Sequence, residues 1–189
     1  MARSTARKRA LNTLYEADEK GQDILSLLAE RIAEPGAQTP LPSYSIDIVR
    51  GVAEHGRVID RILNDHSTGW KIRRMAVVDR NILRIATWEI LFNQEVPNKV
   101  AIDEALGLAK TLSDDDAPSF IHGLLSAICA DEEVMRQFSP SSPDDGEDPA
   151  LQAEEIPLDS GSQGDDQAAD AVTEQASNTT EKPNEEQTK

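Results

Sequence analysis

The sequence predicts an all-α fold, and three observations carry this prediction. Across residues 1–138 the apolar side chains recur every three or four positions, as on helices, and nowhere alternate as on strands. Short segments that contain Gly or Pro separate these runs. The chain has 189 residues, which is enough for one domain with a full core. We therefore expect a compact helical bundle with short connections.

Three helices are expected in the first half of the bundle, at about residues 4–19, 24–34 and 45–64. Gly21 ends the first, Asp23 can cap the second, and Pro35 begins a proline-rich loop. Gly51 and Gly56 would permit close helix contact on the third. The side chains expected to face inward are Ala10, Leu11, Leu14, Ala17, Ile24, Leu27, Leu28, Ile32, Ile48, Val52, Ile59, Ile62 and Leu63.

The second half is expected to hold helices at about 77–93 and 97–112 and a last helix with Pro118 in its first turn. Residues 66–69 form a break, and Trp70 begins a short helical turn. Trp70 and Trp88 lie within apolar stripes, so the pattern favours core positions over base-stacking platforms. The inward residues expected here are Val78, Ile82, Ile85, Ala86, Glu89, Val100, Ala101, Ala105, Leu108, Ala109, Phe120, Ile121, Leu124, Leu125 and Ile128.

Residues 139–189 differ sharply from the rest. They carry 14 Asp and Glu against two Lys and contain no aromatic residue, which predicts a disordered acidic tail after a domain at 1–138. The tail contributes −12 to the net charge of −16, so the first 138 residues stand at −4. Global acidity therefore does not exclude a polyanion as partner. The tail is either a solvated extension or a nucleic-acid mimic that shields a basic site.

No pattern for catalysis, metal binding or membrane insertion is visible, so we expect a cytoplasmic protein that is not an enzyme and needs no cofactor. Cys129 is the single cysteine, and no apolar run approaches the roughly 20 residues of a membrane span. The three histidines lack the spacing of metal ligands. The acidic residues 114–116 lack the alternation of a calcium loop, which favours a helix cap.

Basic residues gather at the start of the first helix: Arg3, Arg7, Lys8 and Arg9. A cation there opposes the helix dipole by about 0.3–1 kcal/mol, so another interaction should favour these residues. A polyanion is the simplest candidate, although short basic N-termini are often merely solvated. Two further basic groups, at 71–74 and at Arg80 with Arg84, fit a solvated face in which Arg84 pairs with Asp79, Asp103 or Glu104.

With these patterns in place, the chain resembles the NusB family over about residues 4–130. The segments that carry the resemblance are Ala6-Arg7 with Ala10 and Leu14-Tyr15, Gly51-Val52-Ala53, Val78-Asp79-Arg80 with Ile82-Leu83-Arg84-Ile85-Ala86 and Trp88-Glu89, Val96-Pro97 with Lys99-Val100-Ala101-Ile102-Asp103-Glu104-Ala105, Leu108-Ala109-Lys110, and Phe120-Ile121-His122-Gly123-Leu124-Leu125. Each segment alone is weak, but their common order and spacing are specific.

The resemblance implies a fold of two small helical subdomains and a role in transcription antitermination. Members of the family pair with the ribosomal protein NusE, bind the single-stranded boxA element of nascent ribosomal RNA, and join an RNA-polymerase complex that resists termination. By motif position, it implies an RNA face and a partner face. The RNA face would comprise Arg3, Arg7, Lys8, Arg9, Tyr15, Asp116, Ser119 and Phe120, and the partner face Asp79 and Arg80.

Two positions depart from the family pattern, which usually has a basic residue before Phe120 and Asn before Gly123. Here they are Ser119 and His122, so we expect weaker phosphate attraction and greater dependence on the partner. Two alternatives remain. A NusB-like domain also precedes a ribosomal RNA cytosine methyltransferase domain, which this chain lacks. The protein could also be a helical interaction module without intrinsic RNA affinity, which forms a homodimer through one apolar helix face.

Overall fold

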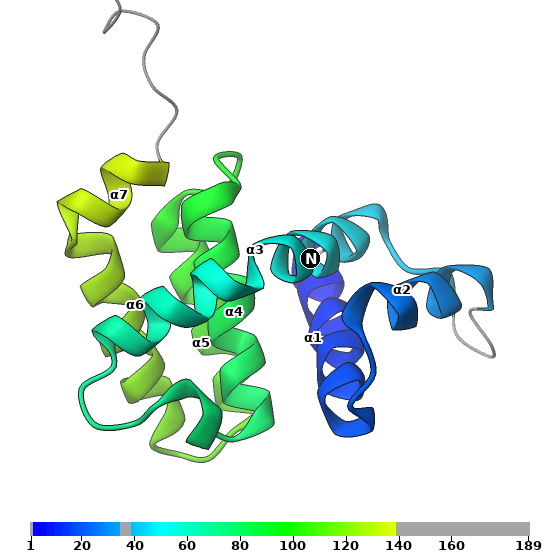
Figure 1. Ribbon diagram of the computed structural model, residues 1–189, viewed down its shortest axis with the longest axis horizontal. Helices are drawn as coiled ribbons and strands as arrows, with labels where there is room; N and C mark the ends of the chain where they lie inside the picture. Colours follow the sequence, from blue (N-terminus) through cyan, green and yellow to red (C-terminus); the bar gives the residue numbers. More distant parts are fainter. Residues whose placement is uncertain (1, 35–38, 139–189) are drawn as a thin grey trace, which may run out of the picture. The chain divides into compact units, whose positions relative to one another are not determined.

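The computed structural model describes residues 2–34 and 39–138, and every regular element within these ranges is helical (Figure 1). The elements are α1 (Ala2–Lys20), α2 (Ile24–Ala33), α3 (Ser43–His66), the 3-10 turn η1 (Ile72–Arg74), α4 (Val77–Phe92), α5 (Asn98–Leu112), α6 (Ala117–Ala130) and α7 (Glu132–Phe138). The predicted all-α class is confirmed for these ranges. The predicted acidic tail, at 139–189, lies outside them. None of the described helices is both long and apolar enough to span a membrane.

The helices form the two predicted sets. In the first set α1, α2 and α3 pack on one another, and in the second α4, α5 and α6 do so, with α7 against α6 and α4. The sets meet where α4 packs on α1 and α3, and Figure 1 shows α3 reaching from one set to the other. This contact places the start of α1 beside α4, so side chains of α4 can pair with the basic residues of α1.

Gly51 lets α3 and α4 approach closely. A Cβ at this position would lie 1.8 Å from the indole Nε1 of Trp88. Any other residue would therefore displace Trp88, which is a core residue. Gly56, the second glycine that the sequence suggested as a contact point, has open space around it. That part of the prediction is wrong, because no described atom outside the helix lies within 4 Å of a Cβ placed there.

The predicted boundary between α1 and α2 is confirmed. Gly21 adopts a left-handed φ of 60°, which ends α1. Asp23 then caps α2, because its Oδ1 accepts the backbone N–H of Ser26 at 2.9 Å. Ile32 and Val100, however, are not inward residues. Ile32 lies on the outer face of α2 with 46% of its surface exposed, and Val100 on α5 is 42% exposed.

The helix α7 is not indicated by the sequence pattern. Asp131 starts it, since its Oδ1 accepts the N–H groups of Glu133 and Val134 at 3.0 and 3.1 Å. Its other oxygen lies 3.1 Å from Nε2 of His66. His66 was expected in a loop but is the last residue of α3. The imidazole thus connects the end of α3 to the start of α7.

Candidate nucleic-acid interface

The basic residues at the start of α1 lie on different faces of the helix. Lys8 belongs to an exposed stripe with Asn12 and Tyr15, and Tyr15 is 39% exposed. Arg7 belongs to the buried face and is 2% exposed, like Leu11 beside it in the core. The expectation that Arg7 holds RNA phosphate directly is corrected, because its guanidinium has almost no contact with solvent.

A buried ion pair explains the position of Arg7. Its Nε donates to both carboxylate oxygens of Glu89 on α4, at 2.9 and 3.0 Å. Its Nη1 lies 3.5 Å from Glu104 on α5, and the hydroxyl of Tyr44 donates to Glu89 as well. Burial opposes the charge of Arg7, but the hydrogen bonds and the attraction of Glu89 outweigh it and raise the pKa of Arg7. Burial and the same carboxylate also raise the pKa of Tyr44. Arg7 therefore fixes the start of α1 against the second helix set.

The other N-terminal cations differ in how far they are engaged. Arg3 pairs with Glu95 at 3.0 Å, with both side chains largely exposed. Arg9 donates to Oγ1 of Thr39 at 3.0 Å. Lys8 is exposed and has no hydrogen bond or ion pair within the described ranges. Contacts with acidic and polar groups therefore offset the unfavourable helix dipole for Arg3, Arg7 and Arg9. Lys8 remains the most available cation of the cluster.

A hollow of about 430 Å³ separates the start of α1 from α5. Lys8 and Ser4 line one wall, and Gly107 and Thr111 line the other. The Oγ of Ser4 donates to Glu104 at 2.8 Å. The lining continues along α5 as far as Leu112. The hollow therefore presents the ammonium of Lys8 together with the carboxylates of Asp103 and Glu104.

The start of α6 supplies the second group of predicted RNA residues. Asp116 and Ser119 are exposed, and Phe120 is half-buried. Asp116 stands at the N-cap position, as the capping interpretation of residues 114–116 predicts, but its side chain makes no capping hydrogen bond. Within residues 2–34 and 39–138, no group of His, Cys, Asp and Glu is arranged to hold a metal ion.

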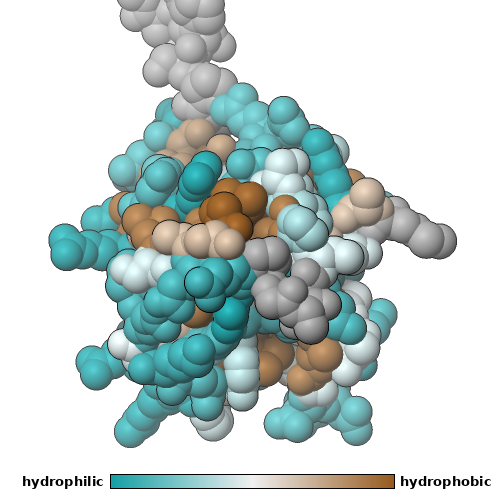
Figure 2. Space-filling view, turned by 90° about the vertical axis from the view of Figure 1, so that its right-hand side faces the viewer, coloured by the Kyte–Doolittle hydropathy of each residue, from teal (hydrophilic) through white to brown (hydrophobic). Residues whose placement is uncertain are grey.

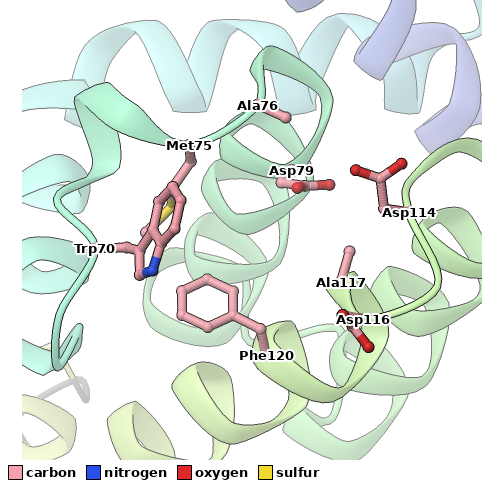
Figure 3. Close-up of a pocket in the computed structure, with 8 residues that line it drawn as sticks. All are labelled: Trp70, Met75, Ala76, Asp79, Asp114, Asp116, Ala117 and Phe120. Atoms are coloured by element: carbon pink, nitrogen blue, oxygen red, sulfur yellow. The ribbon is translucent and has the colours of Figure 1, made fainter.

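A second hollow, of about 450 Å³, joins the two predicted faces (Figure 3). Its lining includes Asp116 and Phe120 from the expected RNA face and Asp79 from the expected partner face. Trp70 and Met75 join Phe120 on the apolar side of the hollow. The Oδ1 of Asp79 is shielded from solvent and has no hydrogen-bond partner among the described residues. The predicted RNA and partner residues are therefore neighbours around one hollow.

Arg80, by contrast, is occupied within the fold. Its Nη2 lies 3.1 Å from Oδ2 of Asp18 on α1. Arg84, one turn later, pairs with Asp18 at 3.2 Å and with Asp60 on α3 at 2.8 Å. These partners differ from the carboxylates expected for Arg84, because α4 turns this face toward α1 and α3. Although burial opposes its charge, the carboxylate of Asp60 raises the pKa of Arg84.

Trp70 is another residue whose burial the sequence interpretation predicted wrongly. Trp88 is in the core, as expected, but Trp70 is 61% exposed. The neighbouring Gly69 has a left-handed φ of 115°, which turns the chain just before the indole. The break at residues 66–69 could have indicated the exposure of Trp70. A residue between a break and a short helical turn need not lie on the apolar face of a helix.

The comparisons with known proteins agree with this fold. The family model described as the NusB family matches residues 4–130. The protein named transcription antitermination protein NusB from Bifidobacterium longum subsp. infantis is 81% identical over 129 residues, covering 68% of this chain and 69% of that protein. The protein of the same name from Beutenbergia cavernae is 49% identical over 143 residues, covering 71% and 94%.

Two solved structures are similar over most of their length. T. maritima NusB has a TM-score of 0.59 and 27% identity, covering 73% of this chain and 93% of that one. A chain in a complex of the antitermination factors NusB and NusE with dsRNA has a TM-score of 0.58 and 26% identity, covering 72% and 97%. With this match of sequence model, relatives and fold, the chain belongs to the NusB family.

Proposed function

We propose that the protein is a transcription antitermination factor that binds the boxA element of nascent ribosomal RNA together with the ribosomal protein NusE. In this role it joins an RNA-polymerase complex that resists termination. Family membership and the name of its relatives support the antitermination role. The similarity to a NusB chain solved with NusE and dsRNA supports the choice of partners.

One structural observation carries the RNA part of the proposal. The hollow beside Lys8 extends along α5 to Leu112, and the hollow beside Phe120 begins at Asp114. Three residues that the family resemblance implies, Lys8, Asp116 and Phe120, thus line two hollows whose linings come within two residues of each other in the sequence. A strand lying along them would meet the ammonium of Lys8 and could stack a base on Phe120. Arg3, Arg9, Tyr15, Asp116 and Ser119 complete the proposed RNA face, and Arg7 positions α1 beneath it.

The proposed NusE contact centres on Asp79. Its unpaired, shielded carboxylate oxygen would be satisfied by a donor from a protein partner. Arg80 would contribute through Asp18, because its guanidinium already binds that carboxylate. RNA and protein partner would then meet around the second hollow, which accounts for joint binding.

The test is binding of a short boxA-like RNA at several salt concentrations, with and without NusE. We expect affinity to rise with NusE, to fall with salt, and to exceed that for a scrambled RNA. Lys8→Ala and Phe120→Ala should weaken binding, whereas Lys99→Ala, an exposed cation at the start of α5, serves as the matched control. Equal affinity for both RNAs, or no binding even with NusE, would contradict the proposal.

The second candidate function is that of a protein-interaction module that forms a homodimer, and one observation favours it. The outer face of α2 exposes Leu25 and Ile32, at 44% and 46%, with the exposed Ala29 between them. Figure 2 views the molecule from this side and shows apolar surface among hydrophilic side chains. Symmetric pairing of this face would bury it. Light scattering at several concentrations, with Ile32→Asp as the comparison variant, separates monomer from dimer.

A further inference from the structure

We infer that the bound RNA strand continues past Phe120 onto Trp70, with a base stacked in the second hollow and its phosphates held by Lys71, Arg73 and Arg74. This inference rests on the proposed function and adds a site that the family motifs do not include. The three cations are called the η1 cluster below. The contacts of Trp70, the charge of its surroundings and the shape of the hollow each contribute to the inference.

Trp70 is exposed on a segment that is itself anchored. Ile72 is 1% exposed and Met75 is 8% exposed, so both hold the segment on the core. The backbone N–H of Ile72 donates to Oδ1 of Asn64 at 2.9 Å, and Ser67 donates to the carbonyl of Trp70. An indole displayed in this way leaves apolar surface in water, which burial under a ligand would recover.

The η1 cluster has no partner inside the described fold. Its three side chains are exposed, and none of them forms an ion pair with a described carboxylate. The arginines of α1 and α4 are different, since Arg7, Arg80 and Arg84 all bind carboxylates. Proteins bind single-stranded nucleic acids with this combination of unpaired cations and exposed aromatic rings, because the cations hold phosphates and the rings stack on bases.

The second hollow has two chemically distinct sides, and these orient the strand. Figure 3 shows Trp70, Met75 and Phe120 on one side, while Asp79 and Asp114 point into the other. Carboxylates repel phosphate but accept hydrogen bonds from base amino groups, such as N4 of cytosine. A strand would therefore turn its bases toward the hollow and its phosphates toward the η1 cluster.

Tryptophan fluorescence provides a direct test. The chain has two tryptophans, and Trp88 is 8% exposed in the core. A boxA-like RNA added to the full chain with NusE should therefore change the emission of Trp70 alone. The change should disappear in Trp70→Phe while affinity is largely kept, because Phe can still stack. Trp70→Ala should weaken binding about 10-fold, within the range for one base stacked on an aromatic side chain.

Salt dependence tests the η1 cluster. The triple variant Lys71→Ala/Arg73→Ala/Arg74→Ala should flatten the slope of log affinity against log salt by about 2, because each phosphate that is no longer neutralised accounts for roughly 0.7. The control Arg50→Ala/Arg57→Ala/Lys99→Ala removes the same charge from exposed residues elsewhere. If both triples change affinity and slope equally, the effect is general charge and the inference is overturned.

The outcomes separate this inference from the proposed function. If Lys8→Ala and Phe120→Ala weaken RNA binding but Trp70→Ala does not, the proposed function stands and the Trp70 site does not exist. If the emission of Trp70 responds to NusE and not to RNA, the hollow holds a basic side chain of the protein partner, and the inference is again overturned. If boxA-like RNA binds no better than scrambled RNA, the proposed function itself fails.

Discussion

Two groups of cations have similar density in the sequence but opposite settings in the structure. At the start of α1, Arg3 and Arg7 bind carboxylates and Arg9 binds the segment at Thr39. The η1 cluster has no such partner among the described residues. In a basic stretch, therefore, only the cations that have no partner within the fold are available to bind a polyanion. Arg3 and Arg7 thus connect α1 to the second half of the bundle, whereas Lys8 and the η1 cluster have no ion pair among the described residues.

The largest expected effect comes from removing the buried pair. Arg7→Ala should lower the free energy of unfolding by about 3–5 kcal/mol, because it leaves Glu89 charged and buried without its partner. Urea denaturation followed by circular dichroism measures this. The adjacent Lys8→Ala should change stability by less than about 0.5 kcal/mol, because Lys8 is exposed and unpaired in the described ranges. Equal destabilisation of the two variants would break the comparison.

The next effect concerns the other end of the contact between the two helix sets. Arg84→Ala should reduce the free energy of unfolding by about 2 kcal/mol, because Asp18 and Asp60 are both deprived of a charged hydrogen-bond donor. Arg50→Ala, on the exposed face of α3, is the matched control and should be near neutral. If Arg50→Ala were as unstable as Arg84→Ala, the loss of stability could not be assigned to the ion pairs of Arg84.

Helix periodicity predicts most of the fold because burial recurs along each helix, as Ile48, Val52 and Ile59 show on α3. It places Glu89 on an inward face as well, and the structure confirms that position. What periodicity does not show is the partner of that carboxylate. Arg7 lies 82 residues earlier in the chain, so the pairing exists only once α1 packs on α4.

The candidate site is less predictable for the same reason. Lys8, Ser119 and Phe120 follow from the family motif, and the structure leaves all three at least partly exposed. Trp70 could not be placed, since its exposure depends on how Ile72 and Met75 anchor a segment outside the regular helices. Exposure in such segments is set by tertiary contacts and leaves no repeating pattern in the sequence.

Acid should weaken the ion pairs of the fold, because it protonates their carboxylates. Hydrogen bonds from Arg31 and Lys20 lower the pKa of Glu16 below its ordinary value of 4.5. The stabilisation is therefore present above that value and is lost as pH falls through the lowered pKa. For a partly exposed pair it amounts to less than about 1 kcal/mol. The difference in thermal midpoint between the native chain and Glu16→Gln should shrink between pH 6 and pH 3. A constant difference would contradict the assignment.

The smallest expected effect on stability comes from deleting residues 139–189. A segment with no aromatic residue and 14 acids should contribute little apolar burial, so the free energy of unfolding should change by less than about 0.5 kcal/mol. The same deletion sharpens the comparison between the cations. The acidic segment should act most strongly on charges that have no carboxylate partner among the described residues, so the η1 cluster and Lys8 are its expected targets.

Deletion should therefore raise RNA affinity at low salt, and the gain should be smaller when the η1 cluster is replaced by alanine. At high salt both gains should vanish, because screening by ions replaces screening by the segment. An equal gain in both proteins would assign the screening to the start of α1. No gain in either would leave residues 139–189 without an electrostatic role in RNA binding. The η1 cluster would then be expected to act on RNA without interference from residues 139–189.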